Sequence, residues 1–329
     1  MDVNDKHDKR EKFGYRIKNL CGRRMGMLQY RKGIIFIFFT VLVLANQYVR
    51  APVQWQHNFM GVTLFFKGVN DEPLFTTDSY INTLQGGEGP TIILLHEIGG
   101  DSLSWGKTLP VLSKYFRVVA PDLTGHGKSA SNDSKVSFDV LLRDLTLLID
   151  KYSAEPVILV GSSFGGWLAT EYAIKNPSMV KELVLISPMG FNNDADWSVL
   201  FPRDEDAMRR RMLALSGGTH TDVADFFIRD MLSVYTKTRA NDLLEEVKTY
   251  PKLNERIELQ DVDVSFIWGT EDTLLPFDRY GENIVAQFKS NPSVILLEGC
   301  GHAPQLSCPN KLLKTILEEY SLSGKAGKL

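Results

Sequence analysis

Three side chains in this sequence have the types and the order that nucleophilic acyl transfer needs: Ser163, Asp272 and His302. Ser163 lies in a Gly-x-Ser-x-Gly pattern, and a serine hydroxyl becomes an effective nucleophile only when a base lies within hydrogen-bond reach. Histidine is the side chain best suited to that task near neutral pH. A carboxylate then holds the imidazole in the right tautomer and stabilises its protonated form. We therefore predict that these three residues form a catalytic triad.

Each of the three candidates follows a run of residues that is typical of a buried strand. Loops at the carboxyl ends of parallel strands gather at one edge of a sheet, where a rigid scaffold positions them. Ser163 stands between its strand and a helix-forming run, so a sharp turn would push it outward, and its flanking glycines would let that turn close. The three predicted strands are residues 157–161, 264–269 and 294–298.

Two of the three assignments have alternatives nearby in the sequence. Glu271 is the alternative acid, but the spacing to Pro276 favours Asp272. His96 and His126 are alternative bases on residue type alone. Each lies in a turn-forming stretch, and we expect their rings to hold backbone turns.

The chain resembles the α/β-hydrolase superfamily over residues 78–320. The order Ser, Asp, His is the order of that family and differs from the orders found on unrelated folds. Within it, the chain is similar to monoacylglycerol-lipase-like enzymes and to meta-cleavage-product hydrolases. The matching stretches are residues 96–105, 120–129, 161–166, 268–276 and 301–302.

This resemblance, together with apolar strand runs that alternate with helical runs, predicts an α/β fold. We expect a mostly parallel eight-stranded sheet flanked by helices, with an antiparallel edge formed by the first two strands. The five further strands are expected at residues 62–68, 79–84, 91–96, 117–121 and 182–187. The predicted organisation is a basic cytoplasmic tail (1–32), a membrane anchor (33–49), a hydrolase core (50–188 and 262–329) and a helical cap (189–261).

The resemblance also implies an oxyanion hole made of two backbone N–H groups. Phe164 supplies one by the geometry of the turn, and Ile98 supplies the second from the loop after residues 91–95. The residue before Ile98 is usually glycine in the family, whereas this chain has Glu97. A carboxylate aimed at the oxyanion would oppose catalysis. We expect the Glu97 side chain to point away, or to meet a cation or a polar group of the substrate.

The resulting functional prediction is a serine hydrolase that cleaves carboxylic esters through an acyl-enzyme on Ser163. The cap helices carry apolar residues, so a small-molecule, medium-sized or lipid-like ester is the expected substrate. One alternative is hydrolysis of a carbon–carbon bond in dienone acids. A second alternative is a non-catalytic ligand receptor on the same fold, for which Glu97 is the one favourable feature.

The N-terminal residues differ sharply in charge from the rest. Residues 1–32 hold ten Lys or Arg and four Asp or Glu, and the 17 residues 33–49 carry no charge. That length is at the low end for spanning a bilayer. A basic flank predicts a single-pass anchor with a cytoplasmic N-terminus and an extracytoplasmic catalytic domain. The alternatives are secretion after signal-peptide cleavage and a segment that lies in the membrane interface.

The remaining sequence features exclude several other classes of function. Residues 1–50 carry 11 basic and 4 acidic groups, so the rest has a net charge of −10, which argues against nucleic-acid binding. We expect no cofactor and no metal, because phosphate loops and ligand spacings are absent from the sequence. The run 209–211 of three arginines is expected to be a solvated face, with an anionic headgroup as the alternative contact. The pairing of Cys300 with Cys308 and the oligomeric state stay open.

Overall fold

The computed structural model describes residues 37, 40–191, 194–218, 222–253, 257, 259, 262–289 and 292–322. The chain divides into two compact units, residues 1–55 and 56–329. Residues 40–50 are helical, and the predicted anchor at 33–49 lies partly outside the described residues. Of the helices in the described part of the chain, none has the length and apolar content needed to cross a bilayer.

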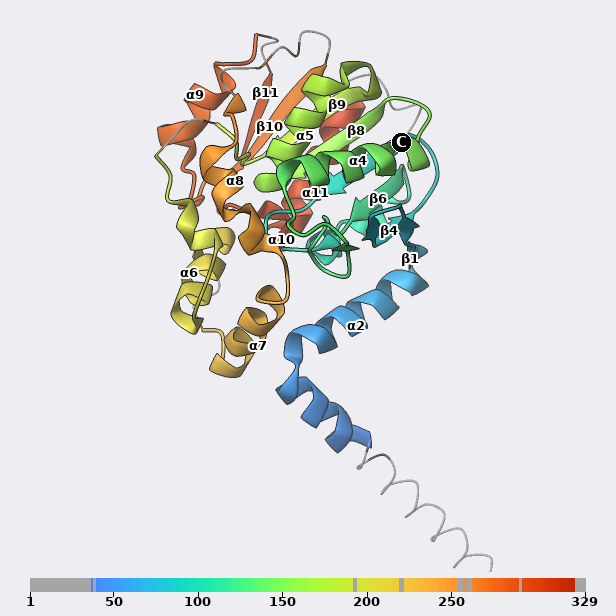
Figure 1. Ribbon diagram of the computed structural model, residues 1–329, viewed down its shortest axis with the longest axis vertical. Coiled ribbons are helices and arrows are strands. Elements are labelled where there is room, and N and C mark those ends of the chain that lie inside the picture. The colour runs from blue at the N-terminus through green and yellow to red at the C-terminus, as the bar shows by residue number, and fades with distance from the viewer. Residues whose placement is uncertain are drawn as a thin grey trace, which may run out of the picture. The chain divides into compact units, whose positions relative to one another are not determined.

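The second unit is built around an eight-stranded sheet (Figure 1). Its strand order is β1-β4-β6-β5-β8-β9-β10-β11, in which β4 pairs antiparallel with both β1 and β6 and the remaining pairings are parallel. The prediction of a mostly parallel eight-stranded sheet with an antiparallel edge is therefore confirmed. The strands are β1 (Val69–Asp71), β4 (Thr83–Gly86), β5 (Thr91–Leu95), β6 (Arg117–Pro121), β8 (Val157–Ser162), β9 (Val180–Ile186), β10 (Asp263–Gly269) and β11 (Ser293–Leu297).

Helices cover both faces of this sheet because successive side chains of its strands are buried on opposite sides. In β5, for example, Ile93 and Leu95 belong to one apolar cluster, and Ile92 and Leu94 belong to another. The first cluster includes α4 (Phe138–Tyr152) and α5 (Phe164–Lys175), and the second includes α3 (Leu109–Leu112) and α11 (Pro309–Leu322). The two helix layers lie on either side of the strands in Figure 1.

Two features of the N-terminal part of the fold were not predicted. A separate three-stranded sheet is formed by β2 (Leu74–Phe75), β3 (Ser79–Ile81) and β7 (Ala130–Ser131). The strand predicted at 62–68 was wrong, because these residues lie mostly in the helix α2 (Pro52–Phe66). The run is rich in residues that favour strands, but burial of Leu64 in the second apolar cluster stabilises a helix here.

Between β9 and β10, where the cap segment 189–261 is predicted, the described residues form helices and no strand, and the first α-helix is α6 (Glu205–Ser216). The N-terminus of α6 is capped by Asp204, whose side chain accepts a hydrogen bond from the N–H of Ala207 at 2.7 Å. It ends at Gly217, which adopts a left-handed conformation. The helices are α6 (Glu205–Ser216), α7 (Asp225–Tyr235) and α8 (Leu244–Thr249), with short 3₁₀ turns η3 (Trp197–Leu200) and η4 (Ala240–Leu243).

Candidate active site

Ser163 lies in a strained turn between β8 and α5. Its φ is 52°, which is uncommon for a residue with a side chain. There is no space for a side chain two residues before the serine, at Gly161, or two residues after it, at Gly165. A Cβ on Gly161 would lie 2.4 Å from the carbonyl oxygen of Gly165, and a Cβ on Gly165 would lie 2.5 Å from that of Leu95. Glycine is therefore required on both sides of the serine.

The structure brings the three predicted triad side chains together. The Nε2 atom of His302 lies 2.9 Å from the Oγ of Ser163, and its Nδ1 lies 2.8 Å from an Oδ atom of Asp272. The side chains of all three residues are buried. This arrangement fits a histidine that takes a proton from the serine while the carboxylate holds its other ring nitrogen. Glu271 is exposed, and the carboxylate within hydrogen-bond distance of the imidazole is that of Asp272. The geometry therefore favours Asp272 as the acid.

The Asp272 carboxylate is held by its own loop as well as by the imidazole. Its Oδ1 atom accepts hydrogen bonds from the backbone N–H groups of Leu274 at 3.0 Å and Leu275 at 2.8 Å. The indole of Trp268 donates to the carbonyl oxygen of Leu275 at 2.8 Å, which fixes the turn. Burial opposes ionisation, but attraction to His302 and the hydrogen bonds outweigh it, so the pKa of Asp272 lies below its ordinary value.

The two predicted oxyanion donors flank this site. Phe164 is the first residue of α5, where helix amides lack an intrahelical acceptor. Ile98 follows β5, and the backbone of β5 approaches the turn so closely that only glycine fits at position 165. In the described part of the chain, no acceptor is recorded for the N–H of Phe164 or of Ile98. Both amides are thus available to an oxygen atom of a ligand.

The unusual Glu97 side chain is directed into the protein. It is 2 % exposed, and its two carboxylate oxygens accept hydrogen bonds from Gln305 at 3.0 Å and from Ser104 at 3.3 Å. Of the outcomes expected for Glu97, the structure therefore supports a carboxylate that is engaged within the fold. A buried carboxylate with such donors is compensated for the loss of water.

The two alternative histidines hold backbone groups. His96 accepts a hydrogen bond from the N–H of Leu123 at 2.9 Å through Nε2, and its Nδ1 lies 2.7 Å from the carbonyl oxygen of Glu97. The Nδ1 of His126 lies 3.2 Å from the carbonyl oxygen of Thr124. Burial lowers the pKa of His96 and lowers that of His126 to about 3. Both rings are neutral near pH 7, and neither is the ring that contacts Ser163.

The cap segment contacts the loop that carries Ile98. Arg211 of α6 donates to the carbonyl oxygen of Ile98 at 2.7 Å and to that of Leu200 at 3.2 Å, and Leu200 also accepts from the hydroxyl of Tyr235 at 3.1 Å. Arg211 is 5 % exposed, so the prediction of a solvated face was wrong for this residue. Its guanidinium is buried because it satisfies backbone carbonyls and stacks on the ring of Tyr235.

The loop that carries His302 is held at several points. A disulfide joins Cys300 to Cys308, which closes the chain around the histidine. The N–H of Ala303 donates to the carbonyl oxygen of Leu215 in α6 at 2.9 Å. The pairing that the sequence left open is therefore present in the structure. Position 302 is fixed by a covalent bond within its loop and by a hydrogen bond to the cap segment.

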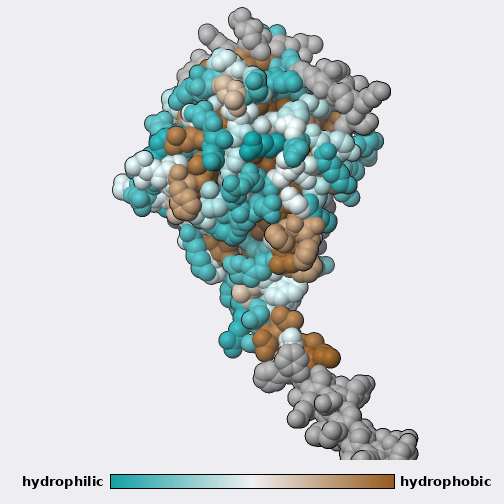
Figure 2. All heavy atoms as spheres, turned by 90° about the vertical axis from the view of Figure 1, so that its right-hand side faces the viewer, coloured by the Kyte–Doolittle hydropathy of each residue, from teal (hydrophilic) through white to brown (hydrophobic). Residues whose placement is uncertain are grey.

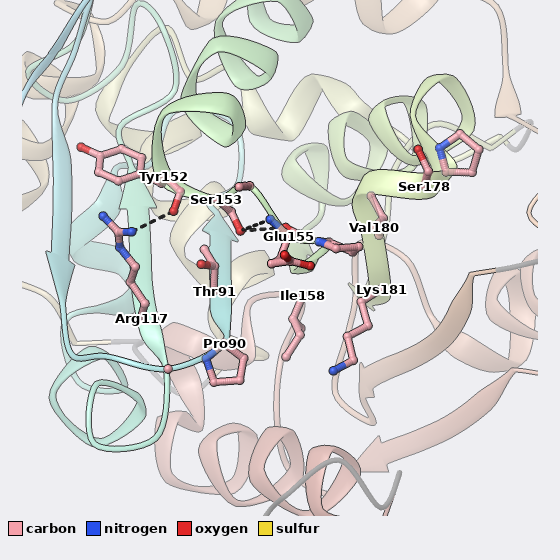
Figure 3. Close-up of a pocket in the computed structure, with 14 residues that line it drawn as sticks. Pro90, Thr91, Arg117, Tyr152, Ser153, Glu155, Ile158, Ser178, Val180 and Lys181 are labelled. Carbon is pink, nitrogen blue, oxygen red and sulfur yellow. Dashed lines mark hydrogen bonds between the residues drawn. The ribbon is translucent and has the colours of Figure 1, made fainter.

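A surface pocket of about 1010 Å³ lies at the amino ends of the strands (Figure 3). Thr91, Arg117 and Val180 line it, and these residues stand at the amino ends of β5, β6 and β9. The triad follows the carboxyl ends of the strands, so this pocket is not part of the site.

Ser163 and His302 are both fully buried. Among the described residues, no group of three or more His, Cys, Asp or Glu side chains could hold a metal ion.

Residues 92–315 match the sequence model of the alpha/beta hydrolase family. The chain belongs to the α/β-hydrolase family. A curated relative of this hydrolase is human monoacylglycerol lipase ABHD6, which is 26% identical over 258 residues, 70% of this chain and 75% of the relative. The predicted family resemblance is confirmed, and the lipase-like relatives support hydrolase activity.

Solved structures resemble the hydrolase over most of its length. A membrane phospholipase A, described as a bacterial virulence factor, superposes with a TM-score of 0.73 at 20% identity and covers 90% of this chain and 100% of its own. A meta-cleavage product hydrolase from Pseudomonas fluorescens IP01 gives a TM-score of 0.68 at 21% identity and covers 77% of this chain and 98% of its own. At these identities the likeness establishes the shared fold.

Two residues at the site were missed by reasoning from the sequence. Gln305 contacts Glu97, and Arg211 contacts Ile98, each across more than a hundred positions of the chain. The nearness of Gln305 to His302 in sequence was the one available signal for the first. The arginine run gave no sign that one of its three members would be buried.

Proposed function

We propose that this hydrolase cleaves carboxylic esters, with Ser163 as nucleophile, His302 as general base and acid, and Asp272 as the acid that orients the imidazole. The observation that carries the proposal is the unbroken hydrogen-bond series from Ser163 through His302 to Asp272. Its order and distances match what a serine needs to become nucleophilic at neutral pH.

The reaction would proceed in two stages. The Oγ of Ser163 attacks the ester carbonyl carbon while its proton moves to Nε2 of His302, and the N–H groups of Phe164 and Ile98 stabilise the oxyanion. The imidazolium then protonates the leaving alcohol, which gives an acyl-enzyme. His302 next takes a proton from water, which attacks the acyl-enzyme and releases the acid while the proton returns to Ser163.

For the substrate, we propose a lipid-like ester. Relatives named as monoacylglycerol lipase, 26% identical in the human case, support this class. The cap segment supports it as well, because Met212, Met231 and Leu232 are only partly buried against the core. Partly exposed apolar side chains in this segment would favour an acyl chain over a polar acyl group.

Hydrolysis of esters is favoured over the two alternatives. The fold shared with a meta-cleavage product hydrolase supports carbon–carbon bond hydrolysis, but at 21% identity it carries the fold alone. The receptor alternative relied on Glu97, whose carboxylate is engaged by Gln305 and Ser104. No observation favours carbon–carbon bond hydrolysis or a receptor over ester hydrolysis.

Hydrolysis of a p-nitrophenyl ester series from acetyl to palmitoyl tests the proposal, with Ser163→Ala as the inactive variant. Ser178→Ala is the matched control, because it removes an exposed hydroxyl at the opposite end of the strands and keeps the triad. We expect turnover by the wild-type protein and the control and none by Ser163→Ala, with longer acyl chains preferred. Turnover of a dienone acid without turnover of any ester would overturn the ester proposal.

We further propose that residues 33–49 attach the protein to a membrane, with the N-terminus cytoplasmic and the catalytic part exported. The basic residues before this stretch support that orientation. The disulfide between Cys300 and Cys308 supports export, because such bonds persist in oxidising compartments. The exposed large apolar side chains among the described residues of this region are Ile37, Val41, Leu42, Val43, Leu44 and Val49.

Fractionation of cells that express the full chain, or a chain beginning at residue 51, tests the attachment. We expect the full chain in the carbonate-washed membrane pellet and the shorter chain in the soluble fraction. Protease added to intact spheroplasts should degrade the catalytic part if it is exported. Release into the medium of a shortened chain, cut near residue 45, would instead establish secretion.

A further inference from the structure

The proposed reaction depends on three loops that come from different strands. Ile98 follows β5, Ser163 follows β8 and His302 follows β11. An oxyanion donor or a base that is displaced by about 1 Å can lower the rate about a hundredfold. Something in the fold must therefore hold these three loops at fixed distances from one another.

One buried amide group connects all three loops. Gln305 lies in α10 (Pro304–Ser307), three residues after His302, and its Nε2 is 3.0 Å from a carboxylate oxygen of Glu97. The same atom is 2.9 Å from the hydroxyl oxygen of Ser162. Glu97 and Ser162 each stand immediately before a residue of the proposed machinery. The amide thus joins the oxyanion loop and the nucleophile turn to the histidine loop.

The chemistry of this contact fixes its orientation. A carboxylate only accepts hydrogen bonds, so the amide group of Gln305 must turn its NH₂ towards Glu97. Hydrogen bonds to a charged acceptor are shorter and stronger than those between neutral groups. Glu97, Gln305 and Ser162 are 2 %, 1 % and 0 % exposed, so water does not compete for these partners.

The surrounding packing confines the carboxylate further. The hydroxyl of Ser104 donates to the other carboxylate oxygen at 3.3 Å. A Cβ on Gly100 would lie 2.4 Å from the Oε1 of Glu97, so glycine at position 100 makes room for the side chain. Both oxygens of Glu97 are occupied, which directs its charge away from the ester.

We propose that Glu97 is a positioning residue, which through its hydrogen bond to Gln305 holds the Ile98 N–H in place as an oxyanion donor. This inference rests on the proposed function and deepens it. The residue that departs from the glycine usual in the family thus supports the catalytic geometry. This role requires an acceptor for the hydrogen bond of Gln305 at position 97, which an amide oxygen can also supply.

The test compares kcat and KM for a p-nitrophenyl ester among variants of the full chain. Glu97→Gln keeps an acceptor for Gln305 and should retain kcat within about threefold, whereas Glu97→Ala removes it and should lower kcat by about 10- to 100-fold, within the range for a displaced oxyanion donor. KM should change little, because the loss falls on the transition state. Equal kcat for Glu97→Ala and the wild type would overturn the inference, and so would equal losses in the two variants.

A reciprocal exchange provides a second test if Glu97→Ala does not fold. Gln305→Glu alone places two carboxylates face to face and should lower kcat. Adding Glu97→Gln to that variant restores one amide and one carboxylate, and should restore kcat to within about fivefold, since complementary pairing is regained. No recovery of kcat in a double variant that melts at the temperature of the wild type would contradict the inference.

Labelling with a fluorophosphonate probe separates failure of this inference from failure of the proposed function. The wild type should be labelled on Ser163, and Glu97→Ala should be labelled more slowly. Absence of both labelling and ester turnover in the wild type would reject the proposed function. A wild type that is active and labelled, beside a Glu97→Ala variant with the same rates, would reject the positioning role alone.

Discussion

At the scale of single residues, the site depends on backbone positions that leave little freedom. Ser163 is one of two described residues other than glycine with a positive φ. Such a conformation costs about 1–3 kcal/mol and persists only where the surrounding structure enforces it. Here the enforcement comes from the pairing of β8 with β5 and β9. The strain directs the Oγ of Ser163 towards His302.

Two neighbouring acids give a matched test of the triad. Replacing Asp272 by Asn should lower kcat by about 10⁴-fold, because an amide favours the wrong imidazole tautomer. Glu271→Gln changes the exposed neighbour and should leave kcat within about twofold, as expected for a surface change. Ester hydrolysis by the two variants, with circular dichroism as a check of folding, decides the assignment. The opposite result would make Glu271 the acid.

The buried His126 predicts how stability depends on pH. Its pKa falls from 6.5 to about 3 on burial, so between those values the unfolded chain binds the extra proton. The free energy of unfolding should therefore fall as the pH drops below 6.5, by up to about 1.4 kcal/mol per pH unit from this residue. Asparagine can still donate to the carbonyl of Thr124, so His126→Asn should have a shallower dependence. Urea denaturation between pH 7 and 4 measures it, and an unchanged slope would refute the prediction.

At the scale of elements, α6 connects two catalytic loops within one turn of helix. Arg211 binds the carbonyl of Ile98, and Leu215, four residues later, accepts from the N–H of Ala303. Residues four apart lie on the same face of a helix. A close approach of Gly217 to Gly301 brings the end of the helix against the histidine loop. This part of the cap segment therefore acts as a brace for the loops.

Two arginines of α6 test the brace. Methionine at position 211 keeps the length of the side chain and removes the donors to Ile98 and Leu200. Losing a hydrogen bond from a charged group costs about 1.5–3 kcal/mol, so Arg211→Met should lower kcat/KM by at least about tenfold. Arg210→Met changes an exposed arginine of the same helix and should cost less than about 0.5 kcal/mol. We would measure kcat/KM and the melting temperature of both variants and of the wild type. Equal changes in the two variants would refute the brace.

At the scale of the whole molecule, α2 contributes one face to the core and leaves another exposed. Leu64 is 1 % exposed and belongs to the cluster that contains Trp105 and Leu109. Phe66, two residues later, is 81 % exposed. Apolar side chains gather in small groups on a largely hydrophilic surface (Figure 2).

These two positions of α2 form a matched pair for stability. Leu64→Ala should lower the free energy of unfolding by about 2–5 kcal/mol, because it leaves a cavity in the core. Phe66→Ala should change it by less than about 0.5 kcal/mol. Urea denaturation of the full chain measures both. A small effect of Leu64→Ala would mean that α2 is not part of the folded core.

The sequence by itself determined the three triad candidates, the last six strands of the main sheet and the helical insertion. These features can be predicted because a strand pattern or a nucleophile motif is recognised from neighbouring residues alone. The order of the motifs along the chain is given by the sequence itself. Glycine at position 161 is likewise dictated by the turn itself, whereas glycine at position 165 is required by the close approach of β5. The strand predicted at 79–84 covers β3 of the smaller sheet and only the first two residues of β4.

Only the tertiary structure decided which distant side chains meet at the site. Gln305 reaches Glu97 across 208 positions, and Arg211 reaches Ile98 across 113. The helical conformation of α2 also depends on tertiary packing, because Leu64 is buried in the second apolar cluster. Such contacts depend on how strands are ordered and how helices cross the sheet. A local pattern states that a residue can be buried, but it does not state which partner makes burial favourable.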